Sequence, residues 1–474
     1  MNRFNPADIA TLAPLFLFAL SGLLLVLAEA FTRGRDRSFL MKMTVAACAI
    51  TGLAAVFMWR KLDGGSEIAF GGMLVVDRLA CFATVLFAGA VAFTAISAAA
   101  HQREYGWENG EFYGLLLLAA SGMTMLAMAG DLVTVFLGIE SMSLAAYVLI
   151  ALRRKGMAGA EGAIKYFLMG AFATGFLLYG IALIYGAAGS TDISAVASAI
   201  AKKPNDPIMV LGILFMVVAF GFKVAAVPFH MWAPDAYQGA PSPVTGFMAS
   251  AIKAAAFIGM IRVFSGAFGG DIMPLGQTGW ATMLAILAAI TMTVANIAAL
   301  RQENVKRMLA YSSISHAGLL LVGIVAMGMN PGGSGQVAVL YYLVAYRVTS
   351  LGVFGIVTWI GGRDRERVLV DDWAGLASKH PAAALAMTIC VLSLAGMPPT
   401  GGFFAKFYVL KAGMEAADQS LLWLVVIGAI NSVVSIFYYL RLVMTMYFRE
   451  PIGEFKPIRA GGIVVVVAVC AALV

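Results

Sequence analysis

The residues of this chain that could do chemistry are charged side chains inside long apolar runs. Two acids, Glu29 and Glu140, stand in this position together with five basic residues: Lys165, Lys223, Lys253, Arg347 and Lys406. On insertion scales, a charge at the centre of a bilayer costs about 2.5–3.5 kcal/mol. Because one chain carries the whole set, we expect a polar interior that serves a function.

Proton transfer is the chemistry that fits these residues. It needs titratable groups linked by water, and lysine is suited because its pKa responds strongly to burial and to a neighbouring carboxylate. Ser312, Ser315 and His316 share one helix face by their i, i+3, i+4 spacing. A lone histidine on such a face is more often a structural hydrogen-bonding group, so the lysines carry the hypothesis. For any single residue the alternative is structural pairing, such as Glu140 with Lys165.

The cysteines and histidines do not form an electron-carrying site. Each cysteine stands alone in an apolar run, and the four histidines are scattered. An Fe–S cluster needs grouped thiolates, and a b-type haem needs paired axial ligands. We therefore predict that the chain itself binds no metal and no redox cofactor.

The composition excludes a water-soluble protein. Of 474 residues, 61% are hydrophobic and 12% are charged, and the mean hydropathy is +0.89; soluble domains carry about 25% charged residues. The net charge of +7 is too dilute to indicate nucleic-acid binding. A membrane span needs about 20 mostly apolar residues, so the chain has room for a dozen or more.

We expect an all-α polytopic membrane protein with about fourteen transmembrane helices. The longest polar stretch, 362–381, is too short for a soluble domain. One basic residue, Arg3, precedes the first run and no small-residue cleavage site stands out, so we expect a retained first span and not a removed signal peptide. The last run is short for a span, which leaves truncation or an incomplete, tilted helix as alternatives. The apolar runs are 9–31, 39–59, 76–100, 112–130, 132–152, 162–187, 208–227, 242–265, 279–300, 308–329, 336–361, 382–412, 420–447 and 461–474.

The loop charges predict the orientation. Odd-numbered loops hold seventeen basic residues, whereas the N-terminal segment and the even-numbered loops hold eight. Since basic residues collect in cytoplasmic loops, we expect the N-terminus on the periplasmic side. Lys42 and Arg441 lie near helix ends, where their side chains can extend to the interface.

Two apolar runs are interrupted at similar places. The seventh continues as GFKVAAVPFHMWAPDAYQGAPSPV and the twelfth reads LSLAGMPPTGGFFAKFYVL. Proline breaks a helix, and paired broken helices are typical of inverted-repeat transporters. We predict two inverted five-helix repeats (helices 4–8 and 9–13) with helices 7 and 12 broken. The expected units are 1–107 (helices 1–3), 108–268 (first repeat), 269–448 (second repeat) and 449–474 (helix 14).

Four segments resemble the antiporter-like membrane subunits of respiratory complex I, most closely the subunit N type. They are GEFYGLLLLAASGMTMLAMAGDLVTVFLGIESMSLAAYVLIA, FGFKVAAVPFHMWAPDAYQGAPSPVTGFMASAIKAAAF, NVKRMLAYSSISHAGLLLVG and LSLAGMPPTGGFFAKFYVL. Together they cover about 110 to 410. GIESMS favours subunit N over subunits L and M, and Lys406 argues against subunit M, which usually has Glu there.

The resemblance implies a role for each relay residue. Glu140 and Lys165 would form an ion pair that gates the relay, and Lys223 would be the central proton-accepting lysine. Lys253, with His316 nearby, would conduct the proton onward, and Lys406 would release it to the outer side.

Two further residues are candidates for tuning the relay. Arg347 departs from the family pattern, and as a permanently charged group it cannot be a relay step; we favour structural pairing over electrostatic tuning of Lys406. His230, in the first break, is the other candidate.

The function implied is a proton-translocating membrane subunit of a proton-translocating NADH:quinone oxidoreductase, located in the bacterial inner membrane. Flavin, Fe–S clusters and quinone would then belong to partner subunits. The expected partners are membrane subunits of the M, K, J, L, A and H types and the lipid bilayer. The alternatives are a cation/proton antiporter subunit, a membrane subunit of a hydrogenase-type complex and, less compatible with the buried charges, a structural anchor.

Overall fold

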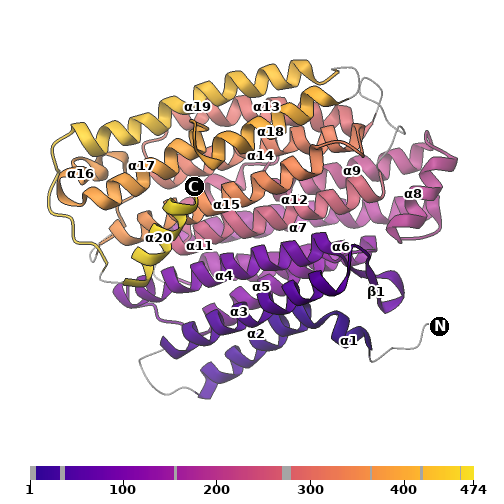
Figure 1. The fold of residues 1–474 in the computed structure, drawn as a ribbon, viewed down its shortest axis with the longest axis horizontal. Coiled ribbons are helices and arrows are strands. Elements are labelled where there is room, and N and C mark those ends of the chain that lie inside the picture. Colours follow the sequence, from indigo (N-terminus) through magenta and orange to yellow (C-terminus); the bar gives the residue numbers. More distant parts are fainter. Residues whose placement is uncertain are drawn as a thin grey trace.

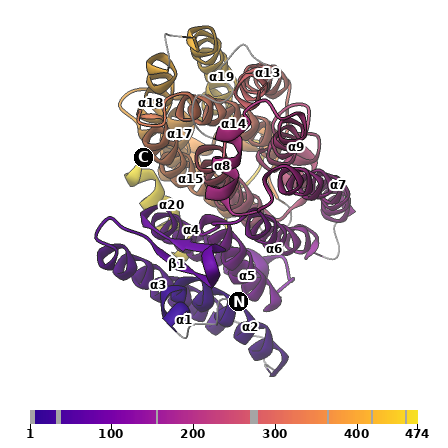
Figure 2. The same cartoon turned by 90° about the vertical axis from the view of Figure 1, so that its right-hand side faces the viewer.

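The chain folds into a bundle of long helices, as a computed structural model shows for residues 7–31, 38–153, 157–268, 279–362, 366–416, 420–458 and 461–474. In Figure 1 the long helices run side by side, from the indigo α2 and α3 at one edge to the gold α19 at the other. Figure 2 looks along many of these helices and shows α4, α5 and α6 between the N-terminal pair and the rest. The predicted all-α membrane fold is confirmed.

Eleven helical segments among the described residues are long and apolar enough to cross a membrane. They are α2 (Ala13–Phe31), α3 (Ser38–Lys61), α4 (Arg78–Glu104), α6 (Leu132–Ala151), α7 (Met157–Ala188), α9 (Pro207–Val224), Ser242–Ser265, α13 (Trp280–Leu300), α14 (Val305–Met329), α15 (Gly335–Ile360) and α19 (Leu422–Phe448). Ser242–Ser265 consists of α11 (Ser242–Phe247), the π-helix η2 (Met248–Ile252), α12 (Lys253–Met260) and the π-helix η3 (Ile261–Ser265).

Shorter helices complete the bundle and its connections. They are α1 (Ala7–Thr11), η1 (Phe70–Gly72), α5 (Glu111–Ala127), α8 (Ile193–Lys202), α10 (Trp232–Gly239), η4 (Val370–Trp373), α16 (Leu376–Lys379), α17 (Pro381–Ala395), α18 (Gly401–Glu415) and α20 (Gly461–Leu473). The two predicted interruptions lie between α9 and α10 and between α17 and α18. The number of spans, the inverted repeats and the four units remain predictions.

One small sheet departs from the all-helical expectation. The strands β1 (Glu67–Ala69) and β2 (Leu74–Val76) pair antiparallel, with Glu67 opposite Val76. Gly71 and Gly72 between them have φ values of 66° and 102°, which glycine adopts without a Cβ penalty. A strand of three residues is too short for the alternation of side chains to be recognised in an apolar sequence.

An ion pair anchors this hairpin to the bundle. Asp77 caps the N-terminus of α4 by accepting from the Ala80 N–H at 2.9 Å, and it binds the Arg262 guanidinium through two bonds of 2.5 and 2.6 Å. Arg262 also donates to the Ala127 carbonyl at the end of α5 at 2.8 Å. The start of α4 and the end of α5 are thereby tied to η3.

Several of the basic loop residues that predict the orientation lie outside the described residues. This applies to Arg3, Arg33, Arg35, Arg37, Arg154, Lys155, Arg363, Arg365 and Arg459, and to the expected repeat boundary at residue 269. The periplasmic placement of the N-terminus therefore stays a prediction.

Close helix contacts depend on glycine where two backbones meet. A Cβ at Gly122 of α5 would lie 2.6 Å from the Met142 nitrogen of α6, and one at Gly138 of α6 would lie 2.7 Å from the Leu126 nitrogen of α5. Small residues allow such approach in membranes. These contacts hold α6, which carries Glu140, against α5.

Gly122→Ala is expected to destabilise the protein by about 1–3 kcal/mol, the usual effect of overpacking, because the obstructing atoms include main chain. Thermal unfolding of the purified protein in detergent measures the effect. Gly175→Ala, on α7, is the matched control, since nothing lies within 4 Å of its added Cβ. Equal unfolding midpoints for the two variants would contradict the close α5–α6 contact.

Candidate functional site

The first break leaves non-helical backbone inside the bundle, and other parts of the protein satisfy it. α9 ends with Ala225 in the left-handed region at φ 60°. The Val227 N–H donates to Thr291 Oγ1 at 2.9 Å, and the Trp232 indole N–H donates to the Phe222 carbonyl at 3.2 Å. Irregular backbone at membrane depth requires such partners.

Lys223 lies in the last turn of α9, directly before this break, and is 4% exposed. Its Nζ donates to Ser143 Oγ of α6 at 2.6 Å. Glu140 precedes Ser143 by three residues, and its carboxylate interacts electrostatically with the Lys223 amine. α6 therefore presents a hydroxyl and a carboxylate to Lys223, the first lysine of the predicted relay.

The predicted Glu140–Lys165 ion pair is wrong. Lys165 Nζ lies 2.6 Å from Glu161 and 2.6 Å from Asp235 of α10, with its side chain 43% exposed. Glu140 instead accepts from Thr174 Oγ1 at 2.5 Å. Thr174 follows Lys165 by nine residues, about 13 Å along α7 at 1.5 Å per residue, so Glu140 lies at a different depth from Lys165.

Lys253 begins α12, directly after the π-helix η2, and is 5% exposed. Its Nζ donates to the Ser313 carbonyl of α14 at 2.7 Å and also to the Ser313 hydroxyl. The Tyr237 hydroxyl lies 3.4 Å from Ser313 Oγ. Lys253 of α12 is thus hydrogen-bonded to two neutral oxygens of one residue on α14.

His316, the last residue of the YSSISH segment, lies between two tyrosines of neighbouring helices. Its Nδ1 lies 2.5 Å from the Tyr342 hydroxyl of α15, and its Nε2 lies 3.2 Å from the Tyr439 hydroxyl of α19. Tyr439 is also hydrogen-bonded to Ser312. Ser312 and His316 therefore do share a face, and both ring nitrogens meet hydroxyls.

Lys406 lies in α18, just after the second break, and is buried. Its Nζ donates at 2.7 Å to the carbonyl of Ala395, the last residue of α17. Gly396 follows in the left-handed region at φ 82°, and a Cβ there would lie 2.7 Å from Lys406 Cδ. The glycine leaves room for the lysine stem at the break.

The two tuning candidates lie apart from these contacts. Arg347 donates to the Leu86 carbonyl of α4 and packs against Gly89. The His230 ring lies 6.4 Å from the Tyr311 ring. Arg347 therefore ties α15 to α4, which agrees with a structural role more than with tuning of Lys406.

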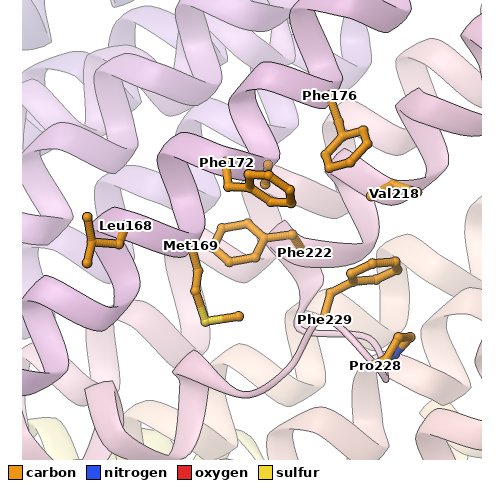
Figure 3. A pocket seen from close by; sticks show the side chains of 9 residues that line it. Leu168, Met169, Phe172, Phe176, Val218, Phe222, Pro228 and Phe229 are labelled. Carbon is orange, nitrogen blue, oxygen red and sulfur yellow. The ribbon is translucent and has the colours of Figure 1, made fainter.

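An apolar groove of about 330 Å³ lies beside the first break. Figure 3 shows side chains of α7 and α9 facing it, with Pro228 and Phe229 of the break. Its lining residues are Leu168, Met169, Phe172, Ala173, Phe176, Val218, Phe222, Pro228 and Phe229. None of these side chains is titratable, so the groove offers no proton-accepting group.

Sequence reasoning missed several oxygen partners. Ser143 could have been found as the residue i+3 from Glu140, and Ser313 stands inside the quoted YSSISH segment. Nothing in the sequence pointed to Thr174, Tyr342 or Tyr439. Among the described residues, no group of three or more His, Cys, Asp or Glu could hold a metal ion.

Four helices of the bundle each carry one buried basic group, namely Lys223, Lys253, His316 and Lys406, and a fifth helix carries Glu140. Their partners are mainly hydroxyls and carbonyls, which can accept a hydrogen bond without taking the proton permanently. Such a series can pass protons when water links its members.

Comparisons with known proteins identify the family of the chain. The family model described as NADH:quinone oxidoreductase/Mrp antiporter, transmembrane, matches residues 129–435, a range that includes every relay residue. NADH-quinone oxidoreductase subunit N 1 of Sorangium cellulosum is 44% identical, over 98% of this chain and 94% of that protein.

Solved structures show the same fold. A chain of respiratory complex I from Thermus thermophilus with bound aureothin is 32% identical, with a TM-score of 0.80 over 97% of this chain and 96% of that one. A chain of the Mrp complex from a Dietzia species has a TM-score of 0.84 over 98% of this chain and 94% of that one, but at 21% identity it shows the fold alone. This chain belongs to the NADH-quinone oxidoreductase subunit N family of antiporter-like membrane proteins.

Proposed function

We propose that this chain moves protons across the membrane through Glu140, Lys223, Lys253, His316 and Lys406, as a subunit of an NADH–quinone oxidoreductase. The observation that carries the proposal is the burial of three lysines on separate helices, each bonded to a neutral oxygen. The family membership supplies the complex. Lys165 is proposed to hold α10 in place through Asp235.

A change in the pKa of a buried lysine involves a free energy similar to that of moving one charge across the membrane potential. Moving one charge across the membrane potential involves about 2.3 kcal/mol per 100 mV. A change of two units in a lysine pKa corresponds to about 2.7 kcal/mol. A change in the charge near one buried lysine can therefore gate a proton step.

The rest of the complex would supply the electron chemistry. We propose that flavin, Fe–S clusters and quinone bind in partner subunits and that this chain contacts membrane subunits of the M and K types, with J, L, A and H types in the same assembly. The loop charges support an inner-membrane location with the N-terminus on the periplasmic side.

Lys223→Ala should lower the number of protons moved per electron while the complex still assembles, because the amine that Ser143 and Glu140 face is gone. NADH oxidation and proton uptake are measured together in sealed vesicles of reconstituted complex. Lys202→Ala, an exposed lysine at the end of α8, is the control. A fully assembled Lys223→Ala complex with the wild-type ratio would remove this residue from the relay.

Glu140→Gln should reduce coupled proton transfer about tenfold, since a hydrogen bond to a charged group contributes about 1.5–3 kcal/mol. Lys165→Ala should reduce it less, because Lys165 pairs with Glu161 and Asp235 instead. Both variants are assayed in the same vesicles after complex content is equalised. Equal losses would restore the idea that Glu140 and Lys165 act as one pair.

Arg347→Leu should lower the amount of assembled complex, because the Leu86 carbonyl loses its guanidinium donor. Arg347→Lys should be partly tolerated, since an amine can still donate. Native gels measure assembly, and proton uptake is then expressed per assembled complex. A normal amount of complex with an altered proton-to-electron ratio would favour tuning over the structural role.

A further inference from the structure

A second charged cluster lies away from the relay, around Glu366. Its carboxylate lies 3.0 Å from His101 Nε2, 3.1 Å from Ser242 Oγ, 3.2 Å from Lys306 Nζ and 3.5 Å from Arg153 Nη1. The side chains of His101 and Lys306 are 0% and 1% exposed, and that of Glu366 is 14% exposed. We call Glu366, His101, Ser242, Lys306 and Arg153 the Glu366 cluster.

The hydrogen bonds define the charge state of the cluster. The Trp107 indole N–H, which can only donate, points to His101 Nδ1 at 3.3 Å, so Nδ1 accepts and Nε2 donates to Glu366. Lys306 also donates to the Ala240 carbonyl. Although burial raises the pKa of Glu366, the Lys306 ammonium and the His101 hydrogen bond hold that pKa well below its usual range.

This pKa direction separates two readings of the cluster. A carboxylate that is to accept protons from solvent needs a pKa near the working pH. Glu366 has a lowered pKa, so its favourable interactions are complete above the ordinary carboxyl pKa and are lost only as the pH falls through the lowered value. It therefore acts as a fixed anion, not as a proton-accepting step.

The position of the cluster connects it to the relay. Ser242 begins α11, the first part of the helical segment Ser242–Ser265, and Lys253 at the start of α12 follows eleven residues further in this segment, about 16 Å at helical rise. Lys306 stands in the first turn of α14, seven residues before Ser313, about 10 Å. The two helices that the Glu366 carboxylate joins are thus the two that meet in the Lys253–Ser313 hydrogen bond.

The backbone around Glu366 reinforces this connection. The Val305 N–H donates to the Val368 carbonyl at 2.6 Å, and the Val370 N–H donates to the Glu303 carbonyl at 2.8 Å. The residues just after Glu366 therefore form a short ladder with the start of α14. The Glu366 carboxylate in addition contacts Ser242 at the start of α11, His101 near the end of α4 and Arg153 after α6.

We propose that Glu366 is a positioning residue that fixes the first turns of α11 and α14 against each other and thereby sets the Lys253–Ser313 contact. The effect on proton transfer rests on the proposed function; the mechanical role of the carboxylate does not. Glu366 belongs to the expected second repeat and Ser242 to the first, so this one side chain joins the two.

The test compares Glu366→Gln, Glu366→Asp and Asp371→Asn in purified complex. Asp371 follows in the same segment and pairs with Arg449 at the surface, both side chains being more than half exposed, so its change to Asn removes the same charge without touching the cluster. Two quantities are measured: hydrogen exchange of peptides covering 238–245 and 303–310, and protons moved per electron in vesicles.

Glu366→Gln is expected to speed exchange in both peptides about tenfold, as loss of a charge-assisted bond implies, and to lower the proton-to-electron ratio. Glu366→Asp should restore part of both, and Asp371→Asn should change neither. Unchanged exchange in Glu366→Gln overturns the positioning role. Faster exchange with a wild-type ratio also overturns it, because the cluster is then structural only.

If the Glu366→Gln complex does not assemble, a double variant with Glu366→Gln and Lys306→Gln is tested, because it also removes the Lys306 ammonium that the first change leaves without its carboxylate. The proposal expects this double variant to assemble with a lowered ratio; a wild-type ratio, or failure to assemble, overturns it. The relay is judged separately. If Lys223→Ala and Lys406→Ala keep the wild-type ratio, the proposed function fails, while the exchange measurement still reports on Glu366.

Discussion

A buried amine in a medium of low dielectric constant needs a hydrogen-bonding partner, and the rest of this structure is arranged around that need. An ion removed from water without compensation costs several kcal/mol. Lys223, Lys253 and Lys406 are each 4–6% exposed, and each has an oxygen within 2.7 Å. The broken helices, the glycine at the second break and the hydroxyl-bearing faces of α6 and α14 all serve to place those oxygens.

Two kinds of partner divide the charged residues by role. The lysines of the proposed relay are hydrogen-bonded to hydroxyls and carbonyls, and Lys223 in addition interacts with the Glu140 carboxylate without a direct ion pair. Lys165, Lys306 and Arg262 instead contact carboxylates within 3.2 Å. A carboxylate favours the charged form of its partner, so these pairs hold elements in place. By this criterion Lys165, which pairs with Asp235 of α10 and not with Glu140, belongs with the residues that hold elements in place.

Much of the fold could be predicted from the sequence because apolar length and proline placement are local signals. Each apolar run became helix, and both breaks stand where proline interrupts a run, at Pro228 and at Pro398. The Glu140–Lys165 pair could not be judged in this way, because it depends on how far α6 and α7 are shifted along each other. Tyr342 and Tyr439 were out of reach for the same reason: only packing brings α15 and α19 to His316. Glu366 stood in a polar stretch that looked like an ordinary loop.

The two breaks also place helix ends in the middle of the bundle, and this has an electrical consequence. The C-terminus of a helix carries the equivalent of about half a negative charge. Lys223 stands in the last turn of α9, and Lys406 donates to the last carbonyl of α17, so both ammonium groups meet the negative pole of a half-helix. Such a pole attracts a cation but has no site that binds a proton. A proton that leaves either lysine therefore leaves behind a neutral amine and an unchanged dipole.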